Sequence, residues 1–219
     1  DSPTPERVKY DIFDRVNRGG TPLNKQEMRN ALYRGRCTRM LDKLCCSPEF
    51  LIATGRSINK ERMKDQYVVL RAIAFLMLHR GEFKDIPALQ YRGDIDDFLA
   101  RFMVYVNDNA PEKLIVDYEN LFIRCMQISY DLLGENGFRF SGNGIRRPIN
   151  MPLFEALSYM FSFVPEKIDY TWASRLILDI ESVKEEFDDS RYFSGNIDST
   201  TSVSFRSVSY THLTLPTKL

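Results

Sequence analysis

The chain has 219 residues, of which 43% are hydrophobic and 27% charged, so it carries enough apolar material for a packed core and is not a disordered segment. The chain has 30 basic and 30 acidic residues, so its net charge is zero. The global charge therefore gives no evidence for or against nucleic-acid binding. The 4 cysteines form no Cys-x-x-Cys pair and only 2 histidines are present, so neither a zinc site nor a disulfide framework is encoded. We expect buried, reduced cysteines and no metal ion.

The chain contains no candidate membrane segment. Its longest purely apolar run, Ala72–Leu78, is far shorter than the roughly 18–20 residues that a membrane-spanning helix needs. No signal-peptide pattern opens the chain. We therefore expect a cytoplasmic protein that does not enter a membrane, a compartment that also keeps cysteines reduced.

Two helices joined by a Gly-Gly loop are predicted at the start of the chain. Apolar residues at helical spacing predict a helix over Pro5–Arg18, which Gly19 and Gly20 end. Asn24 is then placed to cap a second helix, and Glu27, three residues later, completes a capping-box pattern.

Amphipathic patterns predict helices along most of the remaining chain. The predicted helices are Thr38–Cys46, Ser47–Thr54, Asn59–Leu78, Ile95–Val106, Pro111–Leu133, Met151–Val164 and Asp169–Phe187. The segment Asn59–Leu78 becomes apolar on nearly every side, which is typical of a central helix. Glycines and prolines in Gly134–Asn150 indicate irregular structure. Since alternating strand patterns are nearly absent, the fold class is mainly α, a multi-helix bundle.

The two ends of the chain do not resemble natural termini. The stretch Val208–Thr217 reads VSYTHLTLPT, which looks like a translated sequencing-library adapter. We expect residues 208–219 to be non-native and the gene to be a fragment at both ends. His79 is then the only histidine that belongs to the protein, and it lies in no catalytic motif.

The Gly-Gly loop and the helix that follows it could form an anion site. Glycine lets a ligand approach the backbone closely, and the first turn of a helix offers free N–H groups. Arg15 and Arg29 could add bidentate contacts to a phosphate. An ordinary helix stop followed by a capped helix explains the same residues, so both interpretations stay open.

Two clusters of basic residues could contact nucleic acid. Six basic residues and two acidic ones lie between Asn24 and Cys46, and the cations proposed to contact a phosphate backbone are Arg34, Arg36, Arg39 and Lys43. A solvated helix face is the alternative. Arg146 and Arg147 lie at a loop-to-helix junction, where they could grip an anion or pair with Glu155 and other acids.

The chain resembles the second half of the ParB/sulfiredoxin-like domain at the N-terminus of GmrSD-type restriction endonucleases. The family phrase F-x-R-x-N-x-G-G-x-x-L-x-x-x-E-x-R-N-A-L stands complete over Phe13–Leu32, with 11 matching positions. The stretches Arg146–Leu157 and Lys64–Arg71 are also similar to the family. The resemblance runs from about Val8 to about Arg206.

The resemblance implies that residues 1–207 are the helical part of a single domain, a lobe that accompanies a ParB-like α/β lobe. That second lobe carries an Asp-Gly-Gln-Gln-Arg phrase associated with nucleotide hydrolysis or nucleic-acid processing. The phrase is absent from this sequence, so we expect the catalytic lobe to be missing and the fragment to be inactive. The residues implied in nucleotide or phosphate binding are Arg15, Asn17, Gly19, Gly20, Arg29 and Asn30.

The function implied by the resemblance is that of a nucleotide-dependent DNA-processing or restriction protein acting in defence against foreign DNA. NTP and Mg would be the cofactors of the full-length protein, DNA its substrate, and an HNH-type nuclease domain or subunit its partner. The alternative is a non-catalytic DNA- or protein-binding helical module. A third interpretation makes the Arg15–Asn30 set structural, and it predicts that Glu27→Ala unfolds the domain.

Overall fold

The computed structural model describes residues 22–141, 145–165, 167 and 169–210, together with positions 8, 12 and 15. Most of the first predicted helix and the whole Gly-Gly loop therefore lie outside the described residues. Val8, Ile12 and Arg15 are helical and exposed. Across the described ranges the fold is a mainly α multi-helix bundle without strands, which confirms the predicted fold class.

The helices follow the predicted order along the chain. They are α2 (Lys25–Leu32), α3 (Arg36–Cys45), α4 (Pro48–Ala53), α5 (Lys64–His79), α6 (Ile95–Asp108), α7 (Glu112–Leu133), α8 (Met151–Phe161), α9 (Tyr170–Phe187), α10 (Arg191–Ser194) and α11 (Thr200–Ser209). Except at the start of α5, the bounds of α2 to α9 agree with the predictions to within one turn. The last two helices, α10 and α11, were not predicted.

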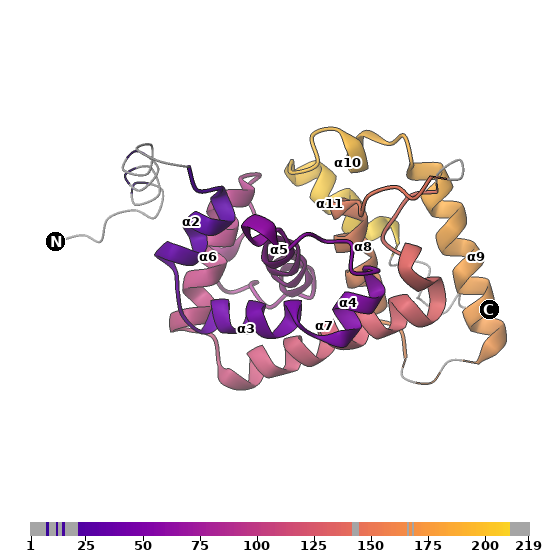
Figure 1. Cartoon of the computed structure of the whole chain (residues 1–219), viewed down its shortest axis with the longest axis horizontal. Coiled ribbons are helices and arrows are strands. Elements are labelled where there is room, and N and C mark those ends of the chain that lie inside the picture. Colours follow the sequence, from indigo (N-terminus) through magenta and orange to yellow (C-terminus); the bar gives the residue numbers. More distant parts are fainter. Residues whose placement is uncertain are drawn as a thin grey trace.

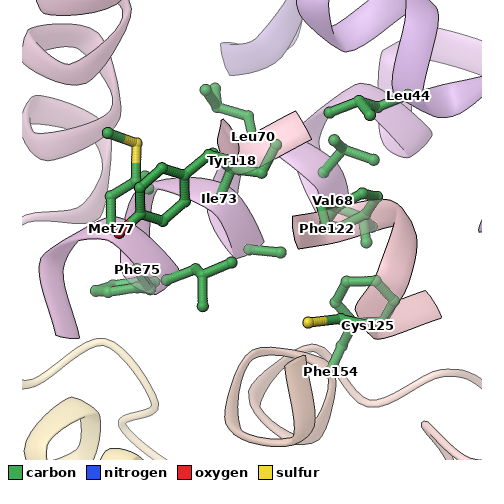
Figure 2. Packing of buried hydrophobic residues seen from close by; sticks show 14 of the residues in the cluster. Leu44, Val68, Leu70, Ile73, Phe75, Met77, Tyr118, Phe122, Cys125 and Phe154 are labelled. Atoms are coloured by element: carbon green, nitrogen blue, oxygen red, sulfur yellow. The ribbon is translucent and has the colours of Figure 1, made fainter. Parts of the chain in front are cut away.

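Helix α5 forms the centre of the bundle, as its apolar pattern predicted. It contacts α3, α6, α7 and α8, and these helices surround it in Figure 1. Figure 2 shows Leu70 and Ile73 of α5 close to Leu44 of α3 and Phe122 of α7, all of them buried. No helix within the described ranges is both long and apolar enough to cross a membrane.

The predicted helix Asn59–Leu78 begins later than expected, at Lys64. Arg62 and Met63 have left-handed backbone angles, with φ of 57° and 58°, and such residues interrupt a right-handed helix. Contacts with the segment around α2 hold this turn: Asn24 Nδ2 donates to the Arg62 carbonyl at 2.7 Å, and Arg62 Nη2 donates to the Pro22 carbonyl at 2.6 Å. The turn is thus fixed by residues far away in sequence.

Helix α3 has Gly35 at its N-cap position, where there is no side chain to cap the helix, and a side chain from α6 supplies the cap. Asn107 Oδ1 accepts the N–H of Cys37 at 2.9 Å, while Asn107 Nδ2 donates to the Tyr33 carbonyl at 2.9 Å. A Cβ atom at Gly35 would overlap the Asn107 side chain. Glycine is therefore needed here for close approach.

The C-terminal helices pack onto α8 and bury part of the stretch predicted to be non-native. Tyr210 is fully buried, with its ring 6.3 Å from those of both Phe187 and Phe193. Residues beyond Tyr210 lie outside the described residues. The adapter-like origin of 208–219 stays a prediction.

The cysteines are all free thiols. Cys37, Cys45 and Cys125 are buried, as predicted, whereas Cys46 is exposed, so the prediction of burial is wrong for this residue. Burial raises the pKa of the Cys125 thiol to about 12. A buried thiol that stays protonated is a packing residue and not a nucleophile.

Candidate functional site

The start of α2 has the predicted capping box. Asn24 Oδ1 accepts the N–H groups of Gln26 and Glu27 at 2.8 and 2.9 Å, and the Glu27 carboxylate accepts the N–H of Asn24 at 2.6 Å. Arg62 Nη2 donates to the same carboxylate at 3.0 Å, and the hydrogen bonds from Arg62 and Asn24 lower the pKa of Glu27. The N–H groups of Gln26 and Glu27 are therefore bonded within the helix cap, whereas the anion-site interpretation requires them to be free.

Arg29, a predicted phosphate ligand, is buried inside the bundle with 1% of its surface exposed. Its Nη1 donates to Asp96 at 2.8 Å and its Nε to Gln26 at 3.0 Å. Burial opposes ionisation of Asp96, but hydrogen bonds from Lys25 and Arg29 outweigh it and lower the pKa of that carboxyl. Arg29 thus ties α2 to α6 through an ion pair.

Asn30 is engaged in the same way. Its Oδ1 accepts from Gln26 Nε2 at 2.8 Å, and its Nδ2 donates to the Gln66 side chain and to the sulfur of Met63. These contacts favour the structural interpretation of the Arg29–Asn30 pair. Arg15 is exposed, whereas Asn17, Gly19 and Gly20 lie outside the described residues, so phosphate binding by the whole set stays a prediction.

The basic residues of α3 lie along one face, because positions 36, 39 and 43 are three and four residues apart. Arg36 pairs with Glu112 at 2.7 Å and Lys43 pairs with Glu119 at 2.5 Å, so both are anchored to α7. The other two predicted contacts, Arg34 and Arg39, are exposed and make no ion pair or hydrogen bond within the described part of the chain. They remain available to an external anion.

Arg146 and Arg147 lie at a cleft of about 600 Å³ that is lined by residues from 135–141, 145–147 and α9. Arg146 Nη2 pairs with Glu135 at 2.9 Å, and Arg147 Nη1 lies 2.6 Å from a carboxylate oxygen of Asp188. The predicted pairing of these arginines with acids is therefore correct, but the suggestion of Glu155 as the partner is wrong.

Two cations of this cleft were missed by the sequence analysis, Arg139 and Lys184. Arg139 is 5% exposed, and its guanidinium donates to the Thr54 carbonyl at 3.3 Å and to the hydroxyl of Ser57. Burial, together with the nearby charge of Arg146, lowers the pKa of Arg139. The only signal in the sequence is that Arg139 stands between two phenylalanines in a segment predicted to be irregular.

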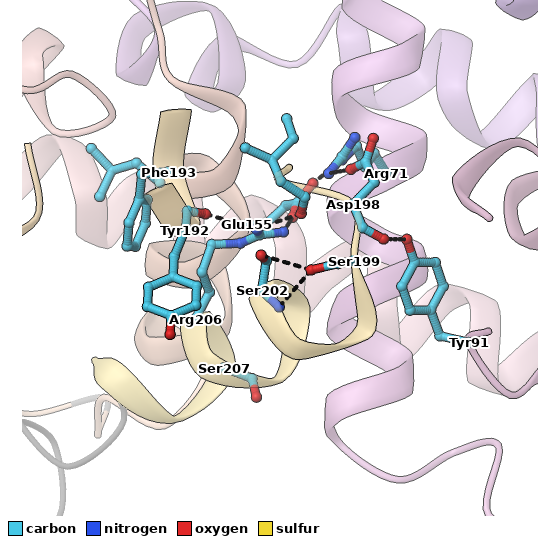
Figure 3. A network of polar contacts seen from close by, with 12 residues as sticks. Arg71, Tyr91, Glu155, Tyr192, Phe193, Asp198, Ser199, Ser202, Arg206 and Ser207 are labelled. Carbon is cyan, nitrogen blue, oxygen red and sulfur yellow. Dashed lines mark hydrogen bonds and ion pairs between the residues drawn. The ribbon is translucent and has the colours of Figure 1, made fainter. Parts of the chain in front are cut away.

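Glu155 instead lies in a buried network that joins α5, α8 and α11, shown in Figure 3. Its two carboxylate oxygens accept from Arg71 and from Arg206, the latter at 3.0 Å. Arg71 Nη2 also donates to Asp198 at 2.6 Å. The cavity beside this network measures about 10 Å³, which leaves room for a single water molecule at most. The network is closed to ligands.

A catalytic group is not evident in the part of the chain that the structure describes. His79 is largely buried, with its ring 5.9 Å from Phe75 and 5.1 Å from Tyr159. Burial and the charge of Arg206 lower the pKa of His79 to about 4. No group of three or more acidic, histidine or cysteine side chains among the described residues is placed to hold a metal ion.

Searches against protein-family models, curated proteins and solved structures return no match for this chain. The features of the chain that point to a function are the phrase over Phe13–Leu32 and the cationic surfaces described above.

Proposed function

We propose that the chain is the helical part of a DNA-processing or restriction protein similar to the GmrSD-type endonucleases, and that it contributes DNA binding and not catalysis. The phrase over Phe13–Leu32 supports the family assignment. The observation that carries the DNA-binding role is a pair of exposed cations, Arg39 on the basic face of α3 and Arg34 just before this helix, neither of which pairs with a described residue.

The geometry of α3 suits contact with a phosphate backbone. Glu112 and Glu119 hold Arg36 and Lys43 against α7. Because these two side chains are already ordered, DNA binding would cost less of their conformational entropy. Arg39 lies between them on the same helix face and projects into solvent. Such a surface reads no base sequence, so the expected binding is weak, sequence-independent and strongly dependent on salt.

The chemistry of the intact protein would lie outside this helical part. In this proposal, nucleotide hydrolysis with NTP and Mg belongs to a ParB-like lobe, and a nuclease domain or subunit is the partner that cuts DNA. The described helices would hold the duplex in place for that partner.

The test measures binding of the full chain to a fluorescently labelled DNA duplex by anisotropy at several salt concentrations. The double variant Arg34→Ala/Arg39→Ala should bind more weakly at low salt. The slope of log K against log salt should become shallower by about 2, since each lost phosphate contact removes about one unit. Arg92→Ala, which removes an exposed arginine from the loop before α6, is the matched control and should leave the slope unchanged. An unchanged slope in the double variant would contradict the proposal.

A further inference from the structure

The floor of the cleft at α9 contains a buried cation, Arg139, that has no carboxylate partner within ion-pair distance among the described residues. Arg139 forms no ion pair with any described residue, and the acceptors of its N–H groups are neutral oxygens, those of Thr54, Ser57, Glu135 and Arg147. A guanidinium taken out of water without a negative partner costs free energy, which an incoming anion would offset.

The other deeply buried arginines of the described chain are neutralised. Arg29 pairs with Asp96, while Arg71 and Arg206 share Glu155. Their exposed fractions are similar to that of Arg139, so burial alone does not explain the difference. What distinguishes Arg139 is its place beside an open cleft.

The cleft as a whole carries excess positive charge. Its four cations are Arg139, Arg146, Arg147 and Lys184. The carboxylates of Glu135, Glu181 and Asp188 pair with three of them, which leaves one positive charge in excess. Arg146 and Arg147 at the rim are 44% and 41% exposed, and each pairs with its carboxylate through one terminal nitrogen. The remaining side-chain nitrogens, Nε and Nη1 of Arg146 and Nε and Nη2 of Arg147, donate no hydrogen bond to a described residue.

We propose that this cleft binds a phosphate group bearing two negative charges, either as inorganic phosphate or as the terminal phosphate of a nucleotide or nucleic-acid end. Arg146 and Arg147 would donate to the phosphate oxygens from the rim, in the bidentate geometry that arginine offers to phosphate. Arg139 and Lys184 would supply the positive potential from the floor. The volume of about 600 Å³ is enough for a mononucleotide.

This proposal does not depend on DNA binding by α3, since the two sites share no residue. It competes with a purely structural role, in which Arg139 compensates the C-terminal end of α4 through the Thr54 carbonyl. Arg146 lies against Gly55, where the backbone has φ of 59° and a Cβ would overlap the guanidinium. The structural role predicts that phosphate has no effect on the protein.

The experiment is calorimetric titration of the full chain with sodium phosphate at constant ionic strength, with sodium chloride as the reference salt. Phosphate should bind the wild-type chain, and the rim variant Arg146→Gln/Arg147→Gln should bind it at least about tenfold more weakly, because two charge-assisted donors are lost. Since both side chains are partly exposed, circular dichroism should show an unchanged fold. Arg175→Gln, on the same helix as Lys184 but 79% exposed, is the matched control and should bind as the wild type does.

Absence of phosphate binding to the wild-type chain up to about 10 mM would overturn the proposal, as would equal affinity in the rim variant. Further arms compare a nucleoside monophosphate with 5′-phosphorylated and unphosphorylated oligonucleotides. Competition by either phosphorylated compound supports the proposal and identifies the source of the phosphate. If the unphosphorylated strand competes equally well, the cleft recognises the diester backbone and the proposal of a terminal phosphate is wrong.

Discussion

Two regions of this protein bury arginine side chains to a similar extent but neutralise them differently. In the network of Figure 3, Arg71 and Arg206 share the carboxylate of Glu155 and leave almost no empty space. In the cleft at α9, the described residues that accept hydrogen bonds from Arg139 do so through neutral oxygens, and its side chain lies beside an open volume.

The difference separates a structural role from a binding role. A closed network with matched charges fixes the position of α11 on α5 and α8, because each carboxylate and guanidinium would be costly to leave unpaired. In an open cleft with excess positive charge, a negatively charged ligand can still gain free energy by neutralising that charge.

The largest expected effect comes from removing the central carboxylate of the closed network. Glu155→Gln leaves Arg71 and Arg206 buried without their shared partner, and it should lower the free energy of unfolding by roughly 3–5 kcal/mol. Urea denaturation measures this loss. The matched substitution in the open cleft, Glu135→Gln, removes an exposed partner and should cost less than about 1 kcal/mol. Similar losses in both variants would show that the two regions do not differ.

A second test uses His79, which is half-buried beside Arg206. Its folded pKa of about 4 lies below the ordinary value of 6.5, so the unfolded chain takes up a proton first as the pH falls. Neutral His79 therefore makes its full contribution to the free energy of unfolding above about pH 6.5. This contribution, about 3 kcal/mol in total, is lost as the pH falls from 6.5 to 4. Denaturation of the wild type and of His79→Gln across this range should show a smaller pH dependence in the variant. Parallel curves would contradict the prediction.

The smallest expected effect is at the capping box of α2, where the carboxylate of Glu27 is close to solvent. Glu27→Ala removes its hydrogen bond with Asn24 and its pair with Arg62 and should cost about 1 kcal/mol. Thermal denaturation would measure this as a modest fall in Tm. Complete unfolding would instead support the third interpretation of the Arg15–Asn30 set, in which the domain depends on that network.

Much of the fold was predictable because the signals are local. The spacing of apolar residues predicted α5 to α9, and the capping-box pattern identified Asn24, which accepts backbone N–H groups at the start of α2. Such a cap depends on a few adjacent residues, so tertiary structure changes it little.

The candidate sites were predictable only in part. The sequence pointed to Arg146 and Arg147 as a cationic pair but gave no sign that Arg139 and Lys184 lie beneath them. Lys184 lies in an acidic stretch of α9, a pattern that predicts an ordinary surface residue, yet its side chain is buried. Its burial follows from the packing of α9 beside residues 134–141, and no local sequence pattern encodes that packing.

The sequence by itself determined that this protein is mainly α, where most helices run and which residues cap them, because backbone hydrogen bonding and apolar periodicity act over a few residues. Only the tertiary structure decided which charges meet. It pairs Glu155 with Arg71 and Arg206 and places Asn107 at the start of α3. It pairs Arg139 with no carboxylate among the residues that the structure describes. Ion pairs and caps of this kind join residues dozens of positions apart, so their partners are chosen by the packing of the helices.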